Sequence, residues 1–129
     1  MRSSYDASQP IRVGRFTIED FHGKKRRLTV PEIFIYSSNI GAAKAALDLG
    51  IERHKAFLGK LGMLGRLSTE IGETAEPLIP SPWGRLNTIT IAFGHGIAVA
   101  PLQAVMGINA CINGGLLIPP TFLKRSEEE

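Results

Sequence analysis

Apolar and polar positions follow two different periods along this chain. Near the start, Ile11–Val13 and Arg15–Ile18 alternate apolar and polar side chains, which predicts two short strands joined at Gly14. From Val30 onward the apolar positions recur at helical spacing instead. Asp20–Gly23, between the two regimes, has the composition of a turn. The pattern therefore predicts an extended start followed by a helical body.

The first helix is predicted to begin at Thr29. Glu32 stands three residues later, which is the spacing of a capping box, and Pro31 is tolerated in a first turn. The helix should be short because the polar triplet Ser37-Ser38-Asn39 interrupts it. A second helix is predicted from about Asn39 to Leu49, with small residues that allow close packing and Gly50 as its C-terminal cap.

Two further helices are predicted in the second half of the chain. One spans about Glu52 to Leu61, with an apolar stripe made by Phe57, Leu58, Leu61 and Leu64. The other begins at Pro101 and ends at Asn113–Gly115. Its predicted inner face consists of Leu102, Val105, Met106 and Cys111 or Ile112.

The segments around these helices are predicted to be irregular or extended. Three prolines forbid a long helix within 65–86, and Trp83 should pin this loop onto the body. Asn87–Ile91 has strand composition or forms a buried extended loop. Phe93–Gly96 makes a tight bend, and Leu116–Ile118 is expected to be a short strand.

Composition narrows the class of protein. The 129 residues are 43% hydrophobic and 21% charged, which is typical of one globular domain. The net charge of +3 owes much to Lys24–Arg27, a run expected to be a solvated loop, so we predict no nucleic-acid partner. No apolar run approaches the roughly 18 residues of a membrane span, and Met1–Tyr5 does not lead into a signal peptide. Taken alone, the chain is predicted to be soluble.

Metal and thiol chemistry find little support in the sequence. His22, His54 and His95 lack partners at ligand spacing, and His54 is expected on the polar side of its helix. Cys111 has apolar neighbours, which favours a buried thiol over a nucleophile. We predict no cofactor and no metal.

The Ser37-Ser38-Asn39 triplet has two interpretations. It can cap the helix that follows, or it can face a cleft and take part in chemistry. Its two candidate functional groups are a hydroxyl that can pass a proton and a carboxamide that can donate to and accept from a peptide.

The segments around the triplet resemble the transpeptidase domain of class B penicillin-binding proteins, most closely the cell-division (septal) type. The resemblance runs from about Tyr5 to Arg125. Its motifs, in order, are Gly14–Ile18 with Asp20–His22, Leu28–Gly41, Ala92–Gly96 with Val99–Gln103, and Asn113–Gly115.

That resemblance implies an α+β parent fold, of which this chain would supply a mainly α-helical part with a few short strands. It also implies that Ser37 and Asn39 are the Ser-x-Asn pair of the catalytic cleft, both catalytic and substrate-binding. Ser37 would relay a proton during acylation and deacylation. Asn39 would hydrogen-bond the peptide carbonyl of the substrate and help to hold the catalytic lysine, while Ser38 would be structural.

Two of the family's three motifs are absent from the sequence. It contains no Ser-x-x-Lys and no Lys-Thr-Gly. We therefore expect residues 1–129 to be a central fragment of a transpeptidase domain that is inactive alone. The relatives' pattern also often has a threonine where Ala100 stands, so the helix at Pro101 should lack a side-chain cap.

The resemblance also implies the partners of the parent protein. These are peptidoglycan stem peptides, β-lactams bound by the intact domain, and proteins of the division complex at the periplasmic face of the bacterial inner membrane. The alternatives are a non-catalytic helical interaction module, a degenerate relic, and a class A β-lactamase-like hydrolase that fits the flanking residues less well. A groove shared by Ser37 and Asn39 favours the transpeptidase, whereas an Asn39 that only caps the helix favours a structural triplet.

Overall fold

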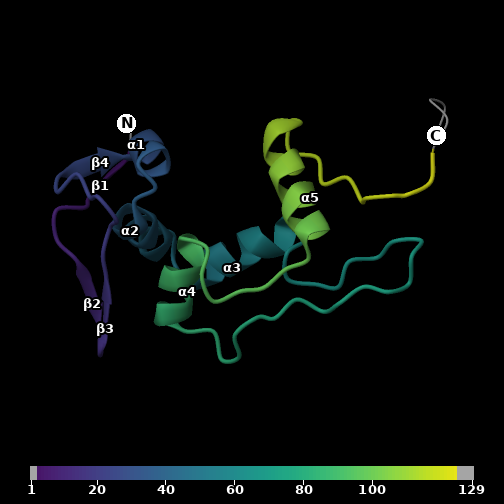
Figure 1. The fold of residues 1–129 in the computed structure, drawn as a ribbon, viewed down its shortest axis with the longest axis horizontal. Helices are drawn as coiled ribbons and strands as arrows, with labels where there is room; N and C mark the ends of the chain where they lie inside the picture. The colour runs from purple at the N-terminus through teal and green to yellow at the C-terminus, as the bar shows by residue number, and fades with distance from the viewer. Residues whose placement is uncertain (1–2, 125–129) are drawn as a thin grey trace. The chain divides into compact units, whose positions relative to one another are not determined.

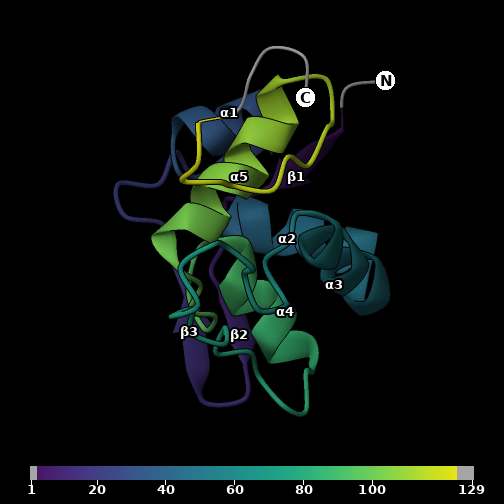
Figure 2. The same ribbon diagram turned by 90° about the vertical axis from the view of Figure 1, so that its right-hand side faces the viewer.

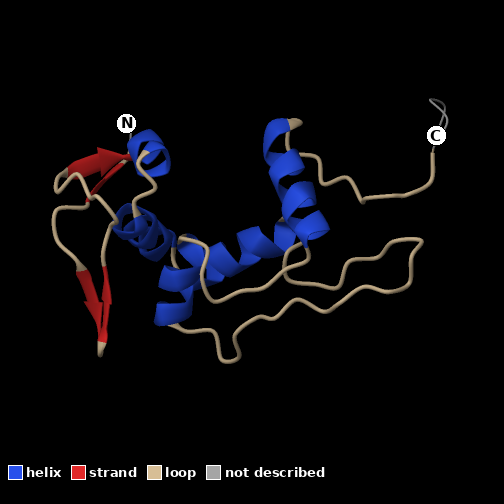
Figure 3. Ribbon diagram, in the orientation of Figure 1, coloured by secondary structure: helices blue, strands red, loops and turns tan. Residues whose placement is uncertain are grey.

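The computed structural model describes residues 3–124, which contain five helices and four strands of three residues each (Figure 1, Figure 3). Helices make up most of the regular secondary structure among the described residues, which confirms the predicted fold class. The chain divides into two compact units. The first joins residues up to His54 with Pro80–Gly96, and the second joins Lys55–Ile79 with residues from Ile97 onward. No helix among residues 3–124 is long and apolar enough to cross a membrane.

The strands of the first unit form two separate antiparallel pairs. β1 (Ser4–Asp6) pairs with β4 (Arg27–Thr29). β2 (Ile11–Val13) pairs with β3 (Phe16–Ile18) in a hairpin that turns at Gly14, where φ is +58°. This hairpin confirms the alternation read from the sequence. Its buried Ile18 packs in one cluster with residues of α2 and α4, and Figure 2 shows the hairpin beside α4.

Helix α1 (Val30–Ile35) begins at the predicted capping box. Glu32 Oε2 accepts a hydrogen bond from the Thr29 backbone N–H at 2.8 Å, and the Glu32 N–H donates to Thr29 Oγ1 at 3.4 Å. Helix α2 (Asn39–Leu49) has the predicted bounds and ends at Gly50, where φ is +88°. Both helices therefore start and stop where local sequence signals place them.

The core of the first unit consists of two apolar clusters. One joins the strands β1 and β4 to α1 and α2, and the other joins the β2–β3 hairpin to α2 and α4. Their buried members are Ala7, Leu28, Ile33 and Ile40 in the first cluster, and Ile18, Ala43 and Ile89 in the second. Because α2 contributes to both clusters, it is the central element of this unit.

The segment predicted as a strand or extended loop at Asn87–Ile91 is instead part of helix α4 (Arg85–Ala92). The Asn87 side chain accepts from the Gly84 N–H at 2.8 Å and caps the helix start. Thr88 Oγ1 accepts from Trp83 Nε1 at 2.9 Å, which also ties the preceding loop down as predicted. The strand preference of threonine and isoleucine is weak and depends on context. Burial of this segment against α2 therefore favours the helix.

Helix α3 (Ile51–Lys60) matches its prediction to within one residue at each end, although Phe57 is half exposed rather than part of a buried stripe. Helix α5 (Pro101–Ile112) belongs to the second unit. Of its predicted inner face, Met106 is buried and Leu102 is partly buried, but the other positions differ. The buried residues are Gln103, Met106, Gly107 and Ala110, whereas Val105, Ile112 and Cys111 are exposed.

Buried Gln103 explains the rotated face of α5. Its Nε2 donates to the carbonyl oxygens of Gly62 at 3.0 Å and Gly65 at 2.7 Å, and its Oε1 accepts from the Ala100 N–H at 3.0 Å. Gln103 is polar yet fully buried, so the spacing of apolar residues alone does not indicate which side of α5 faces inward. The predicted buried thiol of Cys111 is wrong for the same reason.

The predicted strand at Leu116–Ile118 is also absent from the described residues. The Asn113 side chain accepts from the Leu116 N–H at 2.9 Å and donates to the Leu116 carbonyl oxygen at 2.8 Å. Both backbone groups of Leu116 are thereby used in a local turn, so they cannot join a strand ladder.

Candidate active site

The Ser37–Asn39 turn links the end of α1 to the start of α2. The Ser37 N–H donates to the Phe34 carbonyl oxygen at 3.2 Å, and the Ser38 N–H donates to that of Ile33 at 3.0 Å. These two bonds form a Schellman motif, in which the residue after the helix cap takes a left-handed backbone. Ser37 occupies that position with φ of +52°, which glycine adopts without steric cost. The exposed serine hydroxyl is therefore presented from a strained backbone.

Ser38 is the N-cap of α2. Its Oγ accepts from the Gly41 N–H at 2.9 Å and donates to Asp20 Oδ2 at 2.7 Å. Only 3% of its surface is exposed. The capping role therefore falls on the middle residue of the triplet, and neither Ser37 nor Asn39 is needed for it.

Asn39 is the first residue of α2 and is partly buried. Its Nδ2 donates to the Glu19 carbonyl oxygen at 3.0 Å. A carbonyl oxygen can only accept, so this bond fixes which end of the carboxamide is nitrogen. Within residues 3–124 no other hydrogen bond engages the Asn39 side chain, which leaves Oδ1 and the second N–H available to a ligand.

A groove of about 450 Å³ runs beside the turn within the first unit. Both predicted site residues, Ser37 and Asn39, line it together with Ser38. The remaining lining is mainly apolar and comes from α1, α2 and the end of α4: Val30, Ile33, Phe34, Ala42, Ala92 and Phe93. The structure thus brings the two predicted residues to a single groove, with hydroxyl and carboxamide groups set in an apolar wall.

The basic run predicted to be a solvated loop contacts the residue just before the turn. Lys24 Nζ lies 4.8 Å from the centroid of the Tyr36 ring, and the Arg26 guanidinium carbon lies 5.9 Å from it. Arg26 also forms an ion pair of 2.8 Å with Glu32. This guanidinium, with hydrogen bonds from Thr29, lowers the pKa of Glu32 to about 2. All four basic side chains of the run are exposed, as expected, but Arg27 belongs to strand β4 rather than to a loop.

His54 lies in a different environment from the predicted polar helix face. It is 8% exposed, its ring packs edge-on against Trp83 with centroids 6.3 Å apart, and burial lowers its pKa. His22 and His95 are exposed. Among the described residues, no group of three or more His, Cys, Asp or Glu side chains could hold a metal ion.

Two groups that hold the turn in place were not predicted from the sequence. Asp20 and the carbonyl of Glu19 hold the turn from a segment about twenty residues away. The sequence placed Asp20 in a turn and among the family-like motifs, but neither feature indicates that its carboxylate reaches Ser38.

Comparison with known proteins extends over nearly the whole chain. The family model described as "Penicillin binding protein transpeptidase domain" matches residues 2–128. A probable peptidoglycan D,D-transpeptidase FtsI of Caulobacter vibrioides is 37% identical over 122 residues, which cover 95% of this chain and 21% of the relative. A probable peptidoglycan D,D-transpeptidase PbpC of Pseudomonas aeruginosa is 29% identical over 128 residues, covering 93% of this chain and 23% of that protein. The chain thus spans about a fifth of the length of these curated relatives.

Solved structures show the same fold. A peptidoglycan glycosyltransferase from Burkholderia ambifaria aligns with a TM-score of 0.90 at 22% identity, over 99% of this chain and 41% of that one. The transpeptidase domain of Burkholderia pseudomallei penicillin-binding protein 3, in its apo form, aligns with a TM-score of 0.88 at 24% identity, over 99% of this chain and 39% of that one. The arrangement of helices and short strands is therefore a part of a larger transpeptidase fold.

Proposed function

Because the chain belongs to the penicillin-binding protein transpeptidase family, we propose that it forms one wall of the active site of a serine-type peptidoglycan D,D-transpeptidase of the cell-division type. The observation that carries this proposal is the placement of Ser37 and Asn39 on one groove at the start of α2. The substrate class is the stem peptide of peptidoglycan. β-Lactams would enter the same cleft of the intact domain.

Each of the two residues has a separate task in this proposal. The Ser37 hydroxyl, exposed at the end of α1, relays a proton as the acyl-enzyme forms and breaks. Asn39 already uses one N–H on the Glu19 carbonyl oxygen. Its second N–H is free to donate to the carbonyl of a substrate peptide, and its Oδ1 is free to accept from the ammonium group of the family's catalytic lysine.

The remaining catalytic groups are not in this sequence. Neither Ser-x-x-Lys nor Lys-Thr-Gly occurs in the 129 residues. A serine nucleophile requires an activating base and an oxyanion hole. We therefore propose that residues 1–129 are the central part of the transpeptidase domain, and that this polypeptide alone neither reacts with β-lactams nor cross-links peptidoglycan.

The proposal also covers the setting of the whole protein. A septal transpeptidase acts at the periplasmic face of the bacterial inner membrane, together with proteins of the division complex. The family and the name of the Caulobacter vibrioides relative support the peptidoglycan part of this setting.

The test is a chimera in which this chain replaces the matching segment of the Caulobacter vibrioides relative. Acylation by a fluorescent penicillin is measured in the chimera and in its Ser37→Ala and Asn39→Ala variants. We expect labelling of the chimera and a loss of about 100-fold or more in acylation rate for Ser37→Ala, the range for removing a proton-transfer group. Glu52→Ala, an exposed change on α3, is the control and should label normally.

Two results would contradict the proposal. If fluorescent penicillin labels the Ser37→Ala and Asn39→Ala variants as well as it labels the folded parent chimera, neither residue belongs to the site. Specific labelling of the isolated 129-residue chain would show that the missing motifs are not required.

A further inference from the structure

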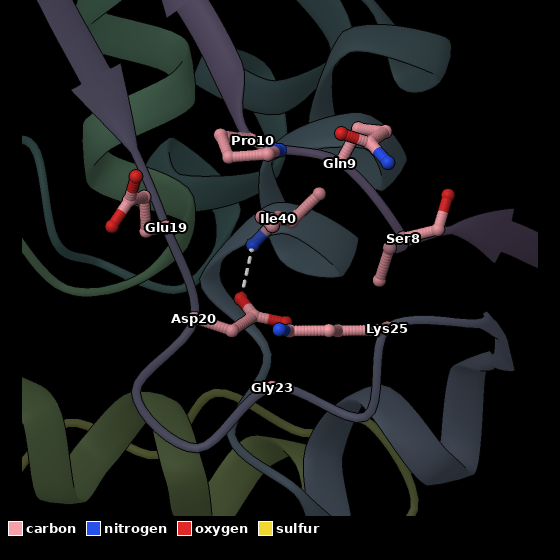
Figure 4. Close-up of a pocket in the computed structure, with 9 residues that line it drawn as sticks. Ser8, Gln9, Pro10, Glu19, Asp20, Gly23, Lys25 and Ile40 are labelled. Atoms are coloured by element: carbon pink, nitrogen blue, oxygen red, sulfur yellow. Dashed lines mark hydrogen bonds between the residues drawn. The ribbon is translucent and has the colours of Figure 1, made fainter.

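Asp20, in the segment that follows β3, uses both carboxylate oxygens on the start of α2. Oδ2 accepts from Ser38 Oγ at 2.7 Å, and Oδ1 accepts from the Ile40 N–H at 2.8 Å. Figure 4 shows the second of these bonds at the wall of a cavity of about 360 Å³, to which Asp20 and Ile40 both contribute. A single side chain thus bridges the residues on either side of Asn39.

The neighbouring backbone completes the bridge. The Glu19 carbonyl oxygen accepts from Asn39 Nδ2 at 3.0 Å, and Ser38 Oγ accepts from the Gly41 N–H at 2.9 Å. Ser38, Asn39 and Ile40 are therefore each bonded directly to residues 19–20. Within residues 3–124, Ser37 is the one residue of the triplet that makes no hydrogen bond to that segment, so its direction depends on how Ser38 is held.

The bridge is well suited to hold its geometry. Ser38 and Ile40 are each 3% exposed, which limits competition from water. Hydrogen bonds to a carboxylate are shorter and stronger than those between neutral groups. A negative charge at a helix N-terminus is also favoured by the helix dipole, and α2 has no acidic residue of its own in its first turn.

We propose that Asp20 is a positioning residue for the candidate active site: by bonding Ser38 Oγ and the Ile40 N–H, it sets the direction in which Ser37 Oγ and the Asn39 carboxamide face the groove. Asp20 does not itself line that groove. Its effect on the reaction would pass entirely through Ser37 and Asn39. The catalytic part of this inference rests on the proposed function, whereas the structural part does not.

The structural part is tested on the 129-residue chain by amide hydrogen exchange. In Asp20→Ala the Ile40 N–H loses its acceptor and Ser38 is released, so exchange at Ile40 and Gly41 should become about 10-fold faster or more. Asp20→Asn keeps an oxygen acceptor for the Ile40 N–H, so exchange at Ile40 should stay slow. It removes the carboxylate that accepts from Ser38 Oγ, so the exchange rate at Gly41 should change. If Asp20→Ala does not fold, the exchange rate at Gly41 in Asp20→Asn still tests whether Asp20 holds Ser38. Unchanged exchange at Ile40 and Gly41 in both variants would overturn the proposal.

The catalytic part is tested in the chimera by a double-mutant cycle. Asp20→Ala should lower the rate of acylation by fluorescent penicillin about 10- to 100-fold, the size expected for a catalytic group displaced by about 1 Å. In a chimera that already carries Ser37→Ala and Asn39→Ala, the same change should have little further effect. An equal loss in both backgrounds would indicate a general loss of structure and would overturn the positioning role.

The two arms separate the possible failures. If the chimera is not acylated at all, the proposed function fails, and the exchange experiment still decides whether Asp20 holds the turn. If the chimera is acylated and Asp20→Ala matches the parent rate, only the positioning role fails. Glu52→Ala removes an exposed carboxylate on α3 and should leave both measurements unchanged.

Discussion

Gly41 lies so close to Ile33 that a Cβ on Gly41 would stand 2.5 Å from Ile33 Cγ1. The two residues belong to α2 and α1, the helices that flank the Ser37–Asn39 turn. Their contact brings the two helix ends together, and buried Ile33 cannot move away without disturbing its cluster.

Gly41→Ala should therefore destabilise the chain by about 1–3 kcal/mol, the usual cost of overpacking a core. The intrinsic helix preference of alanine offsets about 1 kcal/mol of this. Urea denaturation of the 129-residue chain measures the difference. Gly59→Ala, on the exposed side of α3, is the matched control, because its Cβ would meet only Leu64 at 3.9 Å. The control should gain stability. A gain in Gly41→Ala as well would contradict the close contact.

Ser37→Gly should stabilise the chain by about 1 kcal/mol, because glycine accepts the left-handed backbone that a serine at φ +52° resists. Ser37→Ala removes the same hydroxyl but keeps the strain, so it should give no such gain. Denaturation midpoints of both variants make the comparison. Equal midpoints for glycine and alanine would mean that residue 37 is unstrained.

Acid should weaken the start of α1. The Arg26 ion pair and the Thr29 hydrogen bonds lower the pKa of Glu32 from 4.5 to about 2 in the folded chain. A carboxyl group with a lowered folded pKa adds stability above its unfolded pKa, and this stability is lost as the pH falls from 4.5 toward 2.

Glu32→Gln keeps the capping geometry but removes the titrating group. The stability difference between the parent chain and this variant should therefore shrink across that pH range, as followed by urea midpoints. Glu52→Gln controls for the loss of one charge. A difference between parent and Glu32→Gln that stays constant from pH 5 to pH 2 would contradict the role of the ion pair.

Gln103→Leu should destabilise the second unit by about 2–4 kcal/mol. The fully buried amide donates to the carbonyl oxygens of Gly62 and Gly65 and accepts from the Ala100 N–H. Leucine would leave these three backbone groups without hydrogen bonds. Asn109→Ala, an exposed amide on the same helix, is the control and should change stability by less than about 0.5 kcal/mol. Thermal or urea unfolding would distinguish the two. Equal effects of both variants would argue against the buried bonds.

The features that the sequence predicted correctly depend on short-range chemistry. The capping box of α1 joins Thr29 to a residue three positions away, and the end of α2 follows from the backbone freedom of Gly50. These signals act within a few residues, so they can be read without knowing the fold. The family-like motifs added the placement of Ser37 and Asn39, which share a groove in the structure.

The features that were missed depend on distant partners. Asn87–Ile91 became a helix because it is buried against α2, about forty residues earlier in the chain. Gln103 lies on the buried face of α5 because its side chain donates hydrogen bonds to a loop 38 to 41 positions earlier in the chain. Asp20 reaches Ser38 across 18 positions. Nothing in the local pattern of these residues encodes such contacts, because each depends on tertiary packing.

Exposed Cys111 has a practical consequence for measuring the protein in solution. It is the sole cysteine of the sequence and lies in the second unit, whereas the sole tryptophan, Trp83, lies in the first. One maleimide reaction would thus place a single acceptor dye on α5 of the second unit, while Trp83 is the single intrinsic donor of the first. The unmodified sequence therefore already contains a specific fluorescence energy-transfer pair, which can report the separation of the two units without any substitution.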